Sequence, residues 1–249
     1  MVADPLSRYC LIEPLARSET GIVYLARDAR LERHVAFKLL SPEISRDRAR
    51  RESVVQWFSR TARLRHSNIV APLDLGEQDG QLFIVTEYVE GVTLAETLRR
   101  GPVPVSRALD WMESLGSALE YAHREGVVHG DLNPDHLKVD ADGALRVLGF
   151  GIWPAESRSL LAGSLPPKTN YGSPEQMEDR APDAQSDVFA FGAIFYELLS
   201  GQPAFPGERG PDLVDRILHA TPESLPRLRP DLSRGIIAKI GRASCRERV

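Results

Sequence analysis

The sequence predicts an α+β fold of two lobes: a β-rich N-terminal lobe with one main helix, and a mostly helical C-terminal lobe. Short β-branched and aromatic runs, bounded by polar turns, fill most of residues 8–89 and are typical of strands. One long segment in that region has helical periodicity instead. Beyond residue 91, apolar residues recur at helical spacing. This change of character places the boundary between the lobes near residues 88–91.

Four strands and one helix are predicted in the first lobe. The strands are YCLIEPLA (9–16), GIVYLARD (21–28), HVAFKLL (34–40) and LFIVTEYV (82–89). Residues 45–66 are predicted to form a single helix between the third and fourth strands. The apolar stripe of that helix consists of Val54, Val55, Phe58, Ala62 and Leu64.

Helices dominate the predicted second lobe. Residues 94–100 predict a short helix, and residues 106–125 predict a long one. The apolar face of the long helix carries Leu109, Met112, Leu115, Leu119 and Tyr121. The segment SDVFAFGAIFYELLSG (186–201) is almost entirely apolar, which is typical of a buried helix, and Gly201 is a residue type that ends helices.

Composition excludes several classes of function. The chain has 249 residues, of which 42% are hydrophobic and 27% are charged, and its net charge is −4. Without a basic excess we expect no nucleic-acid partner. No stretch approaches 18 apolar residues, so we expect no membrane segment. Two cysteines without metal-ligand spacing indicate a reducing compartment, and with no signal peptide at the N-terminus they favour a cytoplasmic location.

The last ten residues, IGRASCRERV (240–249), differ in character from the rest. They break the amphipathic pattern of the preceding LSRGIIAKI, and they resemble the translation of a sequencing-library adapter. We therefore expect residues 240–249 to be a non-native tail, the alternative being a frayed basic tail.

Six motifs follow one another along the chain. They are HVAFKLL, RHSNIVAPLDLGE, FIVTEYVEGVTLAETL, YAHREGVVHGDLNP, NYGSPEQM and SDVFAFGAIFYELLSGQPAFPG. Through these segments the chain resembles the Hanks-type protein kinase family, in particular its bacterial serine/threonine kinases, over about residues 8–239. The resemblance implies a protein-kinase-like domain at 1–239, with an N-lobe at about 8–87, a hinge at 88–91 and a C-lobe at 92–239. It also implies ATP as a cofactor and other signalling proteins as partners.

The resemblance assigns roles to residues that match the family's motifs. Lys38 has the position of the strand lysine that pairs with the α- and β-phosphates, and Asp131 has the base position, which accepts the substrate hydroxyl proton. The residues that would bind the cofactor are Lys38, Leu15, Gly21, Val23, Ala36, Glu87 and Val89. In the family, apolar residues at the positions of Leu15, Val23 and Ala36 cover adenine. Glu87 and Val89 match the hinge backbone beyond the gatekeeper position, Thr86.

The phosphate-cradling loop departs from the family pattern. The family's G-x-G-x-x-G reads ARSETG (16–21) here, so Ala16 and Ser18 replace the first two glycines and only Gly21 remains. A glycine at each of these positions lets backbone N–H groups approach the phosphates closely. A plain hairpin turn is the alternative interpretation of this stretch.

The glutamate that holds the strand lysine in the family is also absent. By the family spacing its position is occupied by Trp57, or by Gln56 if the register slips by one residue. Glu52 lies roughly 140° round the helix from Trp57. We therefore expect Lys38 to lack its usual ion-pair partner. A tryptophan at this position would pack against apolar surface and could fix the helix by itself.

Four further departures lie in the catalytic loop and just after the hairpin that ends at 145–148. Gly130 replaces the arginine that binds a phosphorylated activation segment, and Asn133 replaces the lysine that steadies the γ-phosphate. His136 replaces the asparagine that holds the second metal, and Gly149 replaces the aspartate that bridges magnesium to the phosphates. Neutral histidine can ligate metals, but magnesium prefers oxygen ligands, so for His136 we favour a structural hydrogen bond. We expect no metal-binding residue and no bound magnesium.

A lysine also replaces the apolar side chain that floors the adenine pocket in the family. This is Lys138, whose alkyl stem could cover a ring while its ammonium group turns aside. A cation under adenine is costly unless it is paired, so we expect ATP binding to be weakened.

Scaffold residues of the family are retained. Glu175 and Asp187 occupy their usual positions, and Asp187 is expected to bind the catalytic-loop backbone. In the family Glu175 pairs with an arginine far downstream, and the pattern runs beyond GIIAKI. We therefore expect a truncated C-lobe with an exposed apolar face and reduced stability.

These departures predict a pseudokinase, a kinase-fold signalling and interaction module with impaired catalysis. Two alternatives stay open. One is an active serine/threonine kinase that transfers the γ-phosphate of ATP to protein hydroxyls, which the retained Lys38 and Asp131 support. The other is a nucleotide sensor that binds ATP without metal and without transfer.

Overall fold

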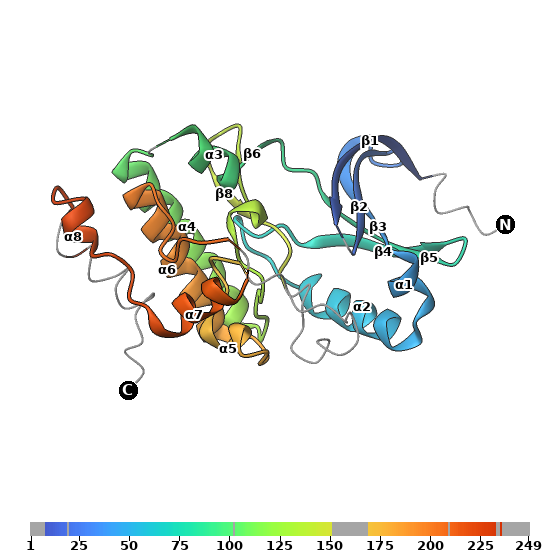
Figure 1. Cartoon of the computed structure of the whole chain (residues 1–249). Helices are drawn as coiled ribbons and strands as arrows, with labels where there is room; N and C mark the ends of the chain where they lie inside the picture. Colours follow the sequence, from blue (N-terminus) through green and yellow to red (C-terminus); the bar gives the residue numbers. More distant parts are fainter. Residues whose placement is uncertain are drawn as a thin grey trace.

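The computed structural model describes residues 8–18, 20–101, 103–150, 169–208, 210–232 and 235. Its two lobes stand side by side, with the strand-rich lobe at the N-terminal end of the chain and the helical lobe following it (Figure 1). The predicted two-lobed α+β fold is thus confirmed. The tail expected at 240–249 lies outside the described residues.

The N-lobe is built on a five-stranded antiparallel sheet with the strand order β1-β2-β3-β5-β4. Its strands are β1 (Tyr9–Ser18), β2 (Gly21–Asp28), β3 (Arg33–Leu40), β4 (Pro72–Gln78) and β5 (Gln81–Glu87). Four of them lie where the sequence predicts strands. The fifth, β4, reads PLDLGEQ and has no β-branched residue, so β-propensity does not reveal it.

Alternation along β3 gives the sheet two different faces. Phe37 stacks on Phe83 on one face, with ring centroids 4.7 Å apart, and Tyr9 packs against both rings. On the other face, Leu40 and Ile84 belong to a second buried cluster that includes residues of the helices packed on the sheet. Lys38 points to this second face, because it is two residues from Leu40 on the same strand.

The prediction of one helix over 45–66 is wrong, because the segment forms two. Helix α1 spans Pro42–Arg46 and helix α2 spans Arg48–Thr61. Between them Asp47 has extended backbone angles, φ −82° and ψ 120°, and its carboxylate accepts a hydrogen bond from Arg50 N at 2.9 Å. Aspartate is a strong N-cap, so this residue starts a new helix.

The predicted apolar stripe of this segment is also partly wrong. Val55 is 50% exposed, whereas Val54 and Trp57 are buried. The break at Asp47 and the docking of Trp57 together set which face of α2 lies on the sheet.

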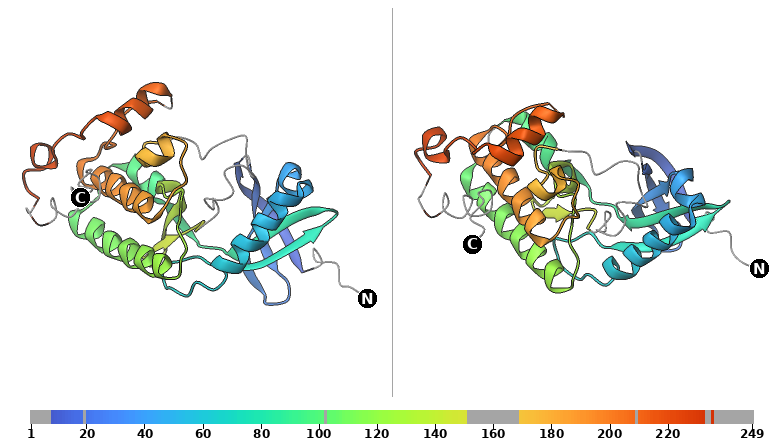
Figure 2. Two further views of the ribbon diagram at one scale, coloured as in Figure 1. Left: turned by 90° about the horizontal axis from the view of Figure 1, so that it is seen from below. Right: turned by 60° about the horizontal axis from the view of Figure 1, so that its bottom comes forward.

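The C-lobe is formed by helices and a small sheet. Its helices are α3 (Leu94–Arg100), α4 (Val105–Arg124), the 3₁₀ turn η2 (Pro134–His136), α5 (Pro174–Met177), α6 (Ala184–Ser200), α7 (Pro211–His219) and α8 (Leu225–Leu228). The predicted helices α3, α4 and α6 are confirmed to within two residues at each end. Gly201 ends α6 in the left-handed conformation, with φ 78°. Helices α4 and α6 lie alongside each other in the lobe's core (Figure 2).

Three short strands form an antiparallel sheet on the side of the C-lobe that faces the N-lobe (Figure 1). They are β6 (Gly91–Thr93), β7 (Leu137–Asp140) and β8 (Leu145–Val147). The predicted hairpin is therefore present as β7 and β8. The β8 strand also binds the segment that follows α2: Val147 N donates to Asn68 O at 2.7 Å, and Val70 N donates to Val147 O at 2.9 Å.

An exposed apolar face on the C-lobe is not found in the described residues. Their exposed large hydrophobic side chains all belong to the N-lobe. They are Leu11, Ile12, Leu15, Leu31, Val55 and Leu73. In the C-lobe, Leu213 and Ile217 of α7 and Leu225 of α8 are buried in the core that contains α6, so these short helices cover its apolar surface.

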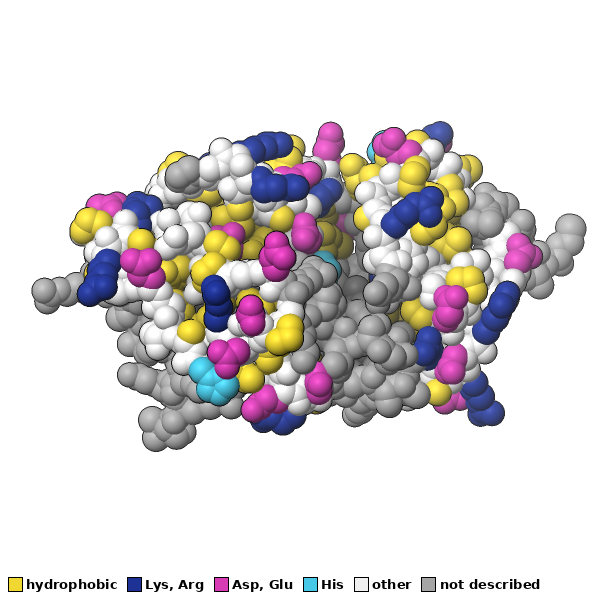
Figure 3. All heavy atoms as spheres, in the orientation of Figure 1, with side chains coloured by type: hydrophobic (Ala, Val, Ile, Leu, Met, Phe, Trp, Pro, Cys, Tyr) yellow, Lys and Arg dark blue, Asp and Glu magenta, His cyan; other side chains and the backbone are white. Residues whose placement is uncertain are grey.

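The surface carries charges of both signs. On the face drawn in Figure 3, Lys and Arg side chains are interspersed with Asp and Glu side chains over both lobes. Within the described ranges, no helix has both the length and the apolar character that crossing a bilayer demands.

Candidate functional site

The sheet gathers the residues predicted for the N-lobe side of the site on one face. Val23 pairs with Lys38 across β2 and β3, and Ala36 pairs with Thr86 across β3 and β5. Directly opposed residues share a face, as do residues two apart on a strand, so these four side chains project together. Leu15 lies at an irregularity of β1, between Pro14 and Ala16, and is 42% exposed.

Lys38 is a half-buried cation without an acidic partner among the described residues. Burial lowers its pKa to about 8, and the negative charge of Asp131, across the lobes, opposes this change. Glu52, the nearest glutamate along the helix, instead binds Arg48 one turn away at 2.9 Å. The predicted loss of the lysine–glutamate pair therefore agrees with the described geometry.

Trp57 takes up a different interaction at the glutamate position. Its indole lies in the buried cluster between α2 and the sheet, and its Nε1 donates a hydrogen bond to Phe150 O at 2.7 Å. The packing against apolar surface that we expected is present. The hydrogen bond was not predictable from sequence, because it joins residues 93 positions apart.

The β1–β2 turn supports the interpretation of the glycine-poor loop as a hairpin. Ser18 pairs with Gly21, and the Ser18 hydroxyl lies 3.0 Å from that of Thr20. Gly21 has φ 140°, and a Cβ added there would lie 2.0 Å from Leu39 O. The one retained glycine is thus required by the close approach of β3, whether or not a phosphate binds above it.

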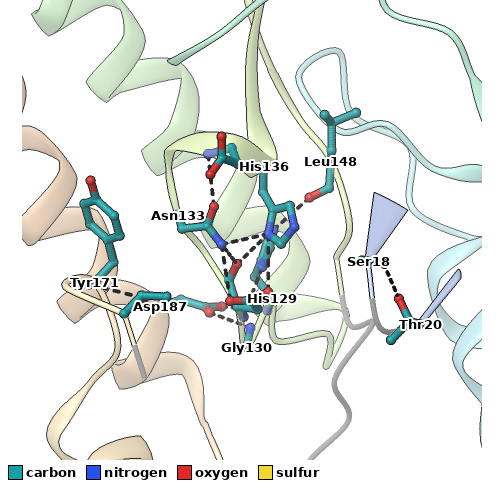
Figure 4. Close-up of polar contacts among 12 residues, drawn as sticks. Ser18, Thr20, His129, Gly130, Asn133, His136, Leu148, Tyr171 and Asp187 are labelled. Atoms are coloured by element: carbon teal, nitrogen blue, oxygen red, sulfur yellow. Dashed lines mark hydrogen bonds and ion pairs between the residues drawn. The ribbon is translucent and has the colours of Figure 1, made fainter. Parts of the chain in front are cut away.

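The catalytic-loop side chains bind one another (Figure 4). Asn133 Nδ2 donates to Asp131 O at 3.0 Å and to Asp131 Oδ1 at 3.2 Å, while Asn133 Oδ1 accepts from Asp135 N and so caps η2. His136 Nδ1 donates to Asp131 O at 2.7 Å. The structural hydrogen bond that we favoured for His136 is therefore present, and Asn133 has a capping role as well.

A buried scaffold supports this loop from below. The carboxylate of Asp187 accepts hydrogen bonds from His129 N at 2.8 Å and Gly130 N at 2.9 Å (Figure 4). It also accepts one from His123 Nε2 at 2.7 Å. His129 Nε2 donates to Leu148 O at 2.9 Å, and burial lowers the pKa of this imidazole. The predicted binding of Asp187 to the loop backbone is confirmed.

Glu175, the other scaffold residue, is buried and accepts a hydrogen bond from Ser186 Oγ at 2.5 Å. This contact ties α5 to the first turn of α6. A buried carboxylate with such a partner avoids part of its desolvation cost.

The end of the β7–β8 hairpin does not match a magnesium site. Gly149 has φ 80°, in the region that favours glycine, and has no side chain to offer. His136 Nδ1 is already engaged with the backbone of Asp131. Among the described residues, no cluster of three or more His, Cys, Asp or Glu side chains is arranged to hold a metal ion. This donor set does not fit the oxygen-rich coordination that magnesium prefers.

Two cations of the C-lobe sheet reach the hinge segment. Lys138 Nζ donates to Val89 O at 2.8 Å and lies 5.3 Å from the ring centre of Tyr88. Arg146 forms an ion pair with Glu87. Sequence reasoning singled out Lys138 but missed Arg146; the β7–β8 register, which pairs the two, could have indicated it.

Comparisons with known proteins agree with this geometry. The family model described as "Protein kinase domain" matches residues 9–236. The serine/threonine-protein kinase PrkC of Bacillus subtilis (strain 168) is 34% identical over 247 residues, which cover 96% of this chain and 38% of PrkC. PknB of Mycobacterium tuberculosis (strain ATCC 25618 / H37Rv) is 37% identical over 215 residues, which cover 81% of this chain and 34% of PknB.

A solved structure gives the same result. The crystal structure of the Mycobacterium tuberculosis PknI kinase domain superposes with a TM-score of 0.74 at 29% identity, covering 96% of this chain and 88% of that domain. The chain spans less than two fifths of the length of the curated relatives PrkC and PknB. With this two-lobed fold and the match of the family model over residues 9–236, the chain belongs to the Hanks-type protein kinase family, with bacterial serine/threonine kinases among its relatives.

Proposed function

We propose that this protein kinase domain is a pseudokinase, which signals by binding other proteins and does not transfer phosphate at an appreciable rate. The main support for the proposal is that the residues at the phosphate- and metal-binding positions of the loop make structural hydrogen bonds or have no side chain. Asn133 and His136, at the positions of the γ-phosphate lysine and of a metal ligand, both bind Asp131, and Gly149 has no side chain.

The physical argument concerns charge. Phosphoryl transfer depends mostly on positioning and on cations that neutralise the developing negative charge. At this site two metal ligands, one lysine and the acidic clamp on Lys38 are all replaced. Asp131 remains, but a general base contributes only ~10²–10⁴-fold and cannot replace the missing electrostatic terms.

The proposed partners are other signalling proteins. Two buried supports of the fold are hydrogen bonds within the protein itself: Asp187 accepts from the backbone of the loop, and Trp57 of α2 donates to Phe150 O. We therefore expect the surface of the domain to be available to a protein partner without bound nucleotide. The helical C-lobe would supply most of that surface.

A transfer assay tests the proposal. The full chain is incubated with radiolabelled ATP, magnesium or manganese, and a generic serine/threonine acceptor protein, beside an active bacterial kinase as a reference. We expect no transfer above that of Asp131→Asn. Transfer that is abolished in Asp131→Asn would overturn the proposal.

A reversion variant strengthens this test. The triple variant Asn133→Lys, His136→Asn, Gly149→Asp returns two metal ligands and one cation to the loop. If the missing charges are the cause, the triple variant will gain transfer that depends on magnesium. Each single reversion is expected to gain little, because these groups act as a unit.

An active kinase is the second candidate, favoured by the retention of Lys38 and Asp131 and by relatives that are named kinases. The Asp131→Asn comparison separates it from the pseudokinase.

A metal-independent nucleotide sensor is the third candidate, favoured by Val23 and Ala36, which lie on one face of the sheet with Lys38. It requires an ATP-dependent rise in melting temperature that EDTA does not remove.

A further inference from the structure

The two cations that reach the hinge come from one face of the C-lobe sheet. Lys138 on β7 is paired with Arg146 on β8. Directly opposed residues of an antiparallel pair project to the same side, so both side chains rise from the sheet towards the N-lobe. The sheet itself lies between the hinge and the C-lobe helices (Figure 1).

Their targets are neighbouring positions of the segment that joins the lobes. Arg146 binds the carboxylate of Glu87, at the end of β5, and Lys138 binds the carbonyl oxygen of Val89, two residues on. The ring of Tyr88, between them in sequence, lies against the ammonium group. The two side chains therefore hold three consecutive residues, at 87–89, where β5 ends and the hinge begins.

Lys138 is well supported in this position. Its hydrogen bond to Val89 is charge-assisted, and its contact with the Tyr88 ring adds a cation–π attraction. Burial lowers the pKa of the ammonium, and the negative charge of Glu96 on α3 opposes this. Moving the ammonium away would break both contacts and leave the carbonyl of buried Val89 without this donor.

We propose that Lys138 and Arg146 form a hinge clamp that closes the base-binding edge of the site to adenine. Adenine bound at the hinge would bring its own N–H donors to the backbone carbonyls there, where the Lys138 ammonium already donates to Val89. The base would also have to lie over a cation. This inference deepens the proposed function, because it adds the base-binding edge to the lost metal site as a reason for poor nucleotide binding.

Adenosine is the probe that isolates the clamp. It carries no phosphate, so the replaced residues of the metal site and the phosphate-binding position of Lys38 do not influence the result. The wild-type chain, Lys138→Leu and Lys138→Met are titrated with adenosine in EDTA by calorimetry and by melting temperature. The control is Arg99→Leu, which removes an exposed cation of α3.

We expect no detectable adenosine binding by the wild type or by Arg99→Leu. Lys138→Leu and Lys138→Met should bind adenosine at least about tenfold more tightly than the wild type, with a rise in melting temperature. Methionine keeps the straight stem without the charge, so it serves if the leucine variant does not fold.

Two results would overturn the clamp: wild type that binds adenosine within about threefold of the Lys138 variants, or folded Lys138 variants that do not bind it. Neither result affects the proposed lack of transfer. Conversely, phosphate transfer by the wild type would overturn the proposed function, whatever the adenosine titration shows.

Discussion

The indole Nε1 of Trp57 donates a hydrogen bond to the backbone oxygen of Phe150 at 2.7 Å. Trp57 belongs to α2 in the N-lobe, and Phe150 follows the β8 strand of the C-lobe. The bond therefore ties the main helix of one lobe to the backbone of the other. Neither partner is charged, so this hydrogen bond does not depend on a lysine–glutamate pair, which is absent from the described part of the chain.

Replacing Trp57 by phenylalanine should destabilise the fold by about 2–4 kcal/mol. The change leaves the Phe150 oxygen without its donor, which costs about 1–3 kcal/mol, and it leaves a small cavity in the cluster under α2. Chemical denaturation followed by far-UV circular dichroism measures the loss.

The matched control is the same substitution at Trp111. Its Nε1 also donates to a backbone oxygen, that of Gly143, but the bond is longer, at 3.1 Å, and is only partly buried. We expect Trp111→Phe to cost less than Trp57→Phe. Equal losses of stability in the two variants would show that the hydrogen bond between the lobes stabilises the protein no more than the bond within the C-lobe does.

Lys38→Met should stabilise the protein near pH 7, by about 1–2 kcal/mol. The lysine pays a burial cost there, since burial lowers its pKa to about 8 and no described carboxylate forms an ion pair with it. Methionine keeps the length of the stem and removes the charge. Denaturation midpoints of the two proteins measure the difference.

The pH dependence of that difference follows from the direction of the shift. The pKa of Lys38 is about 8 in the folded state, compared with 10.5 for an unperturbed lysine, which represents the unfolded chain. Between these values the unfolded chain binds the extra proton, so wild-type stability rises relative to Lys38→Met as the pH increases. The advantage of the variant should be full below about pH 8 and small by about pH 10. An advantage that is constant over this range would contradict a lowered pKa, and Arg99→Met is the control with an exposed cation.

Gly21→Ala should destabilise the N-lobe by about 3 kcal/mol or more. The added Cβ would lie 2.0 Å from Leu39 O, so β2 and β3 would have to separate at their paired ends. Gly80→Ala is the control, because Gly80 also has a positive φ, 76°, but no atom within 4 Å of the added Cβ. Its expected cost is only the left-handed strain, about 1–2 kcal/mol. Similar costs at both positions would mean that the close approach of β3 is not what requires Gly21.

Periodicity was sufficient to predict most of the fold. The apolar patterns of β3 and α6 are typical of a strand and of a buried helix, and Gly201 marks the end of α6. The break at Asp47 was missed because a helical pattern runs through it, and only the capping geometry shows that the residue is extended. Strand β4 was missed because its pairing with β5, not its composition, makes it a strand.

The candidate site was predictable as far as residue identity goes. Family spacing indicated Lys38, Asp131 and Gly149, and in the structure the negative charge of Asp131 opposes the lowering of the Lys38 pKa by burial. Spacing could not predict the hydrogen-bond partners of Trp57 and Lys138, the residues that stand where the family has a glutamate and an apolar side chain. The bonds of Trp57 to Phe150 and of Lys138 to Val89 join segments 93 and 49 residues apart, and only the packing of the lobes decides them.

Asp187 allows a test of whether the catalytic loop is held in place by the protein alone, without nucleotide or metal. Its carboxylate is buried and accepts from two backbone N–H groups, those of His129 and Gly130. Asp187→Ala would leave both donors unpaired in the interior, so we expect a loss of about 3–5 kcal/mol. Asp187→Asn keeps one acceptor oxygen and should lose about half as much.

The readout for both variants is the free energy of unfolding in the absence of nucleotide and metal, with the exposed Asp212→Ala as control. If the loop is maintained as a structural platform, the losses will appear in full under these conditions. Losses below about 1 kcal/mol for Asp187→Ala would mean that the loop is not held by this carboxylate. The retained aspartate would then be better explained by a catalytic site that forms only when its ligands bind.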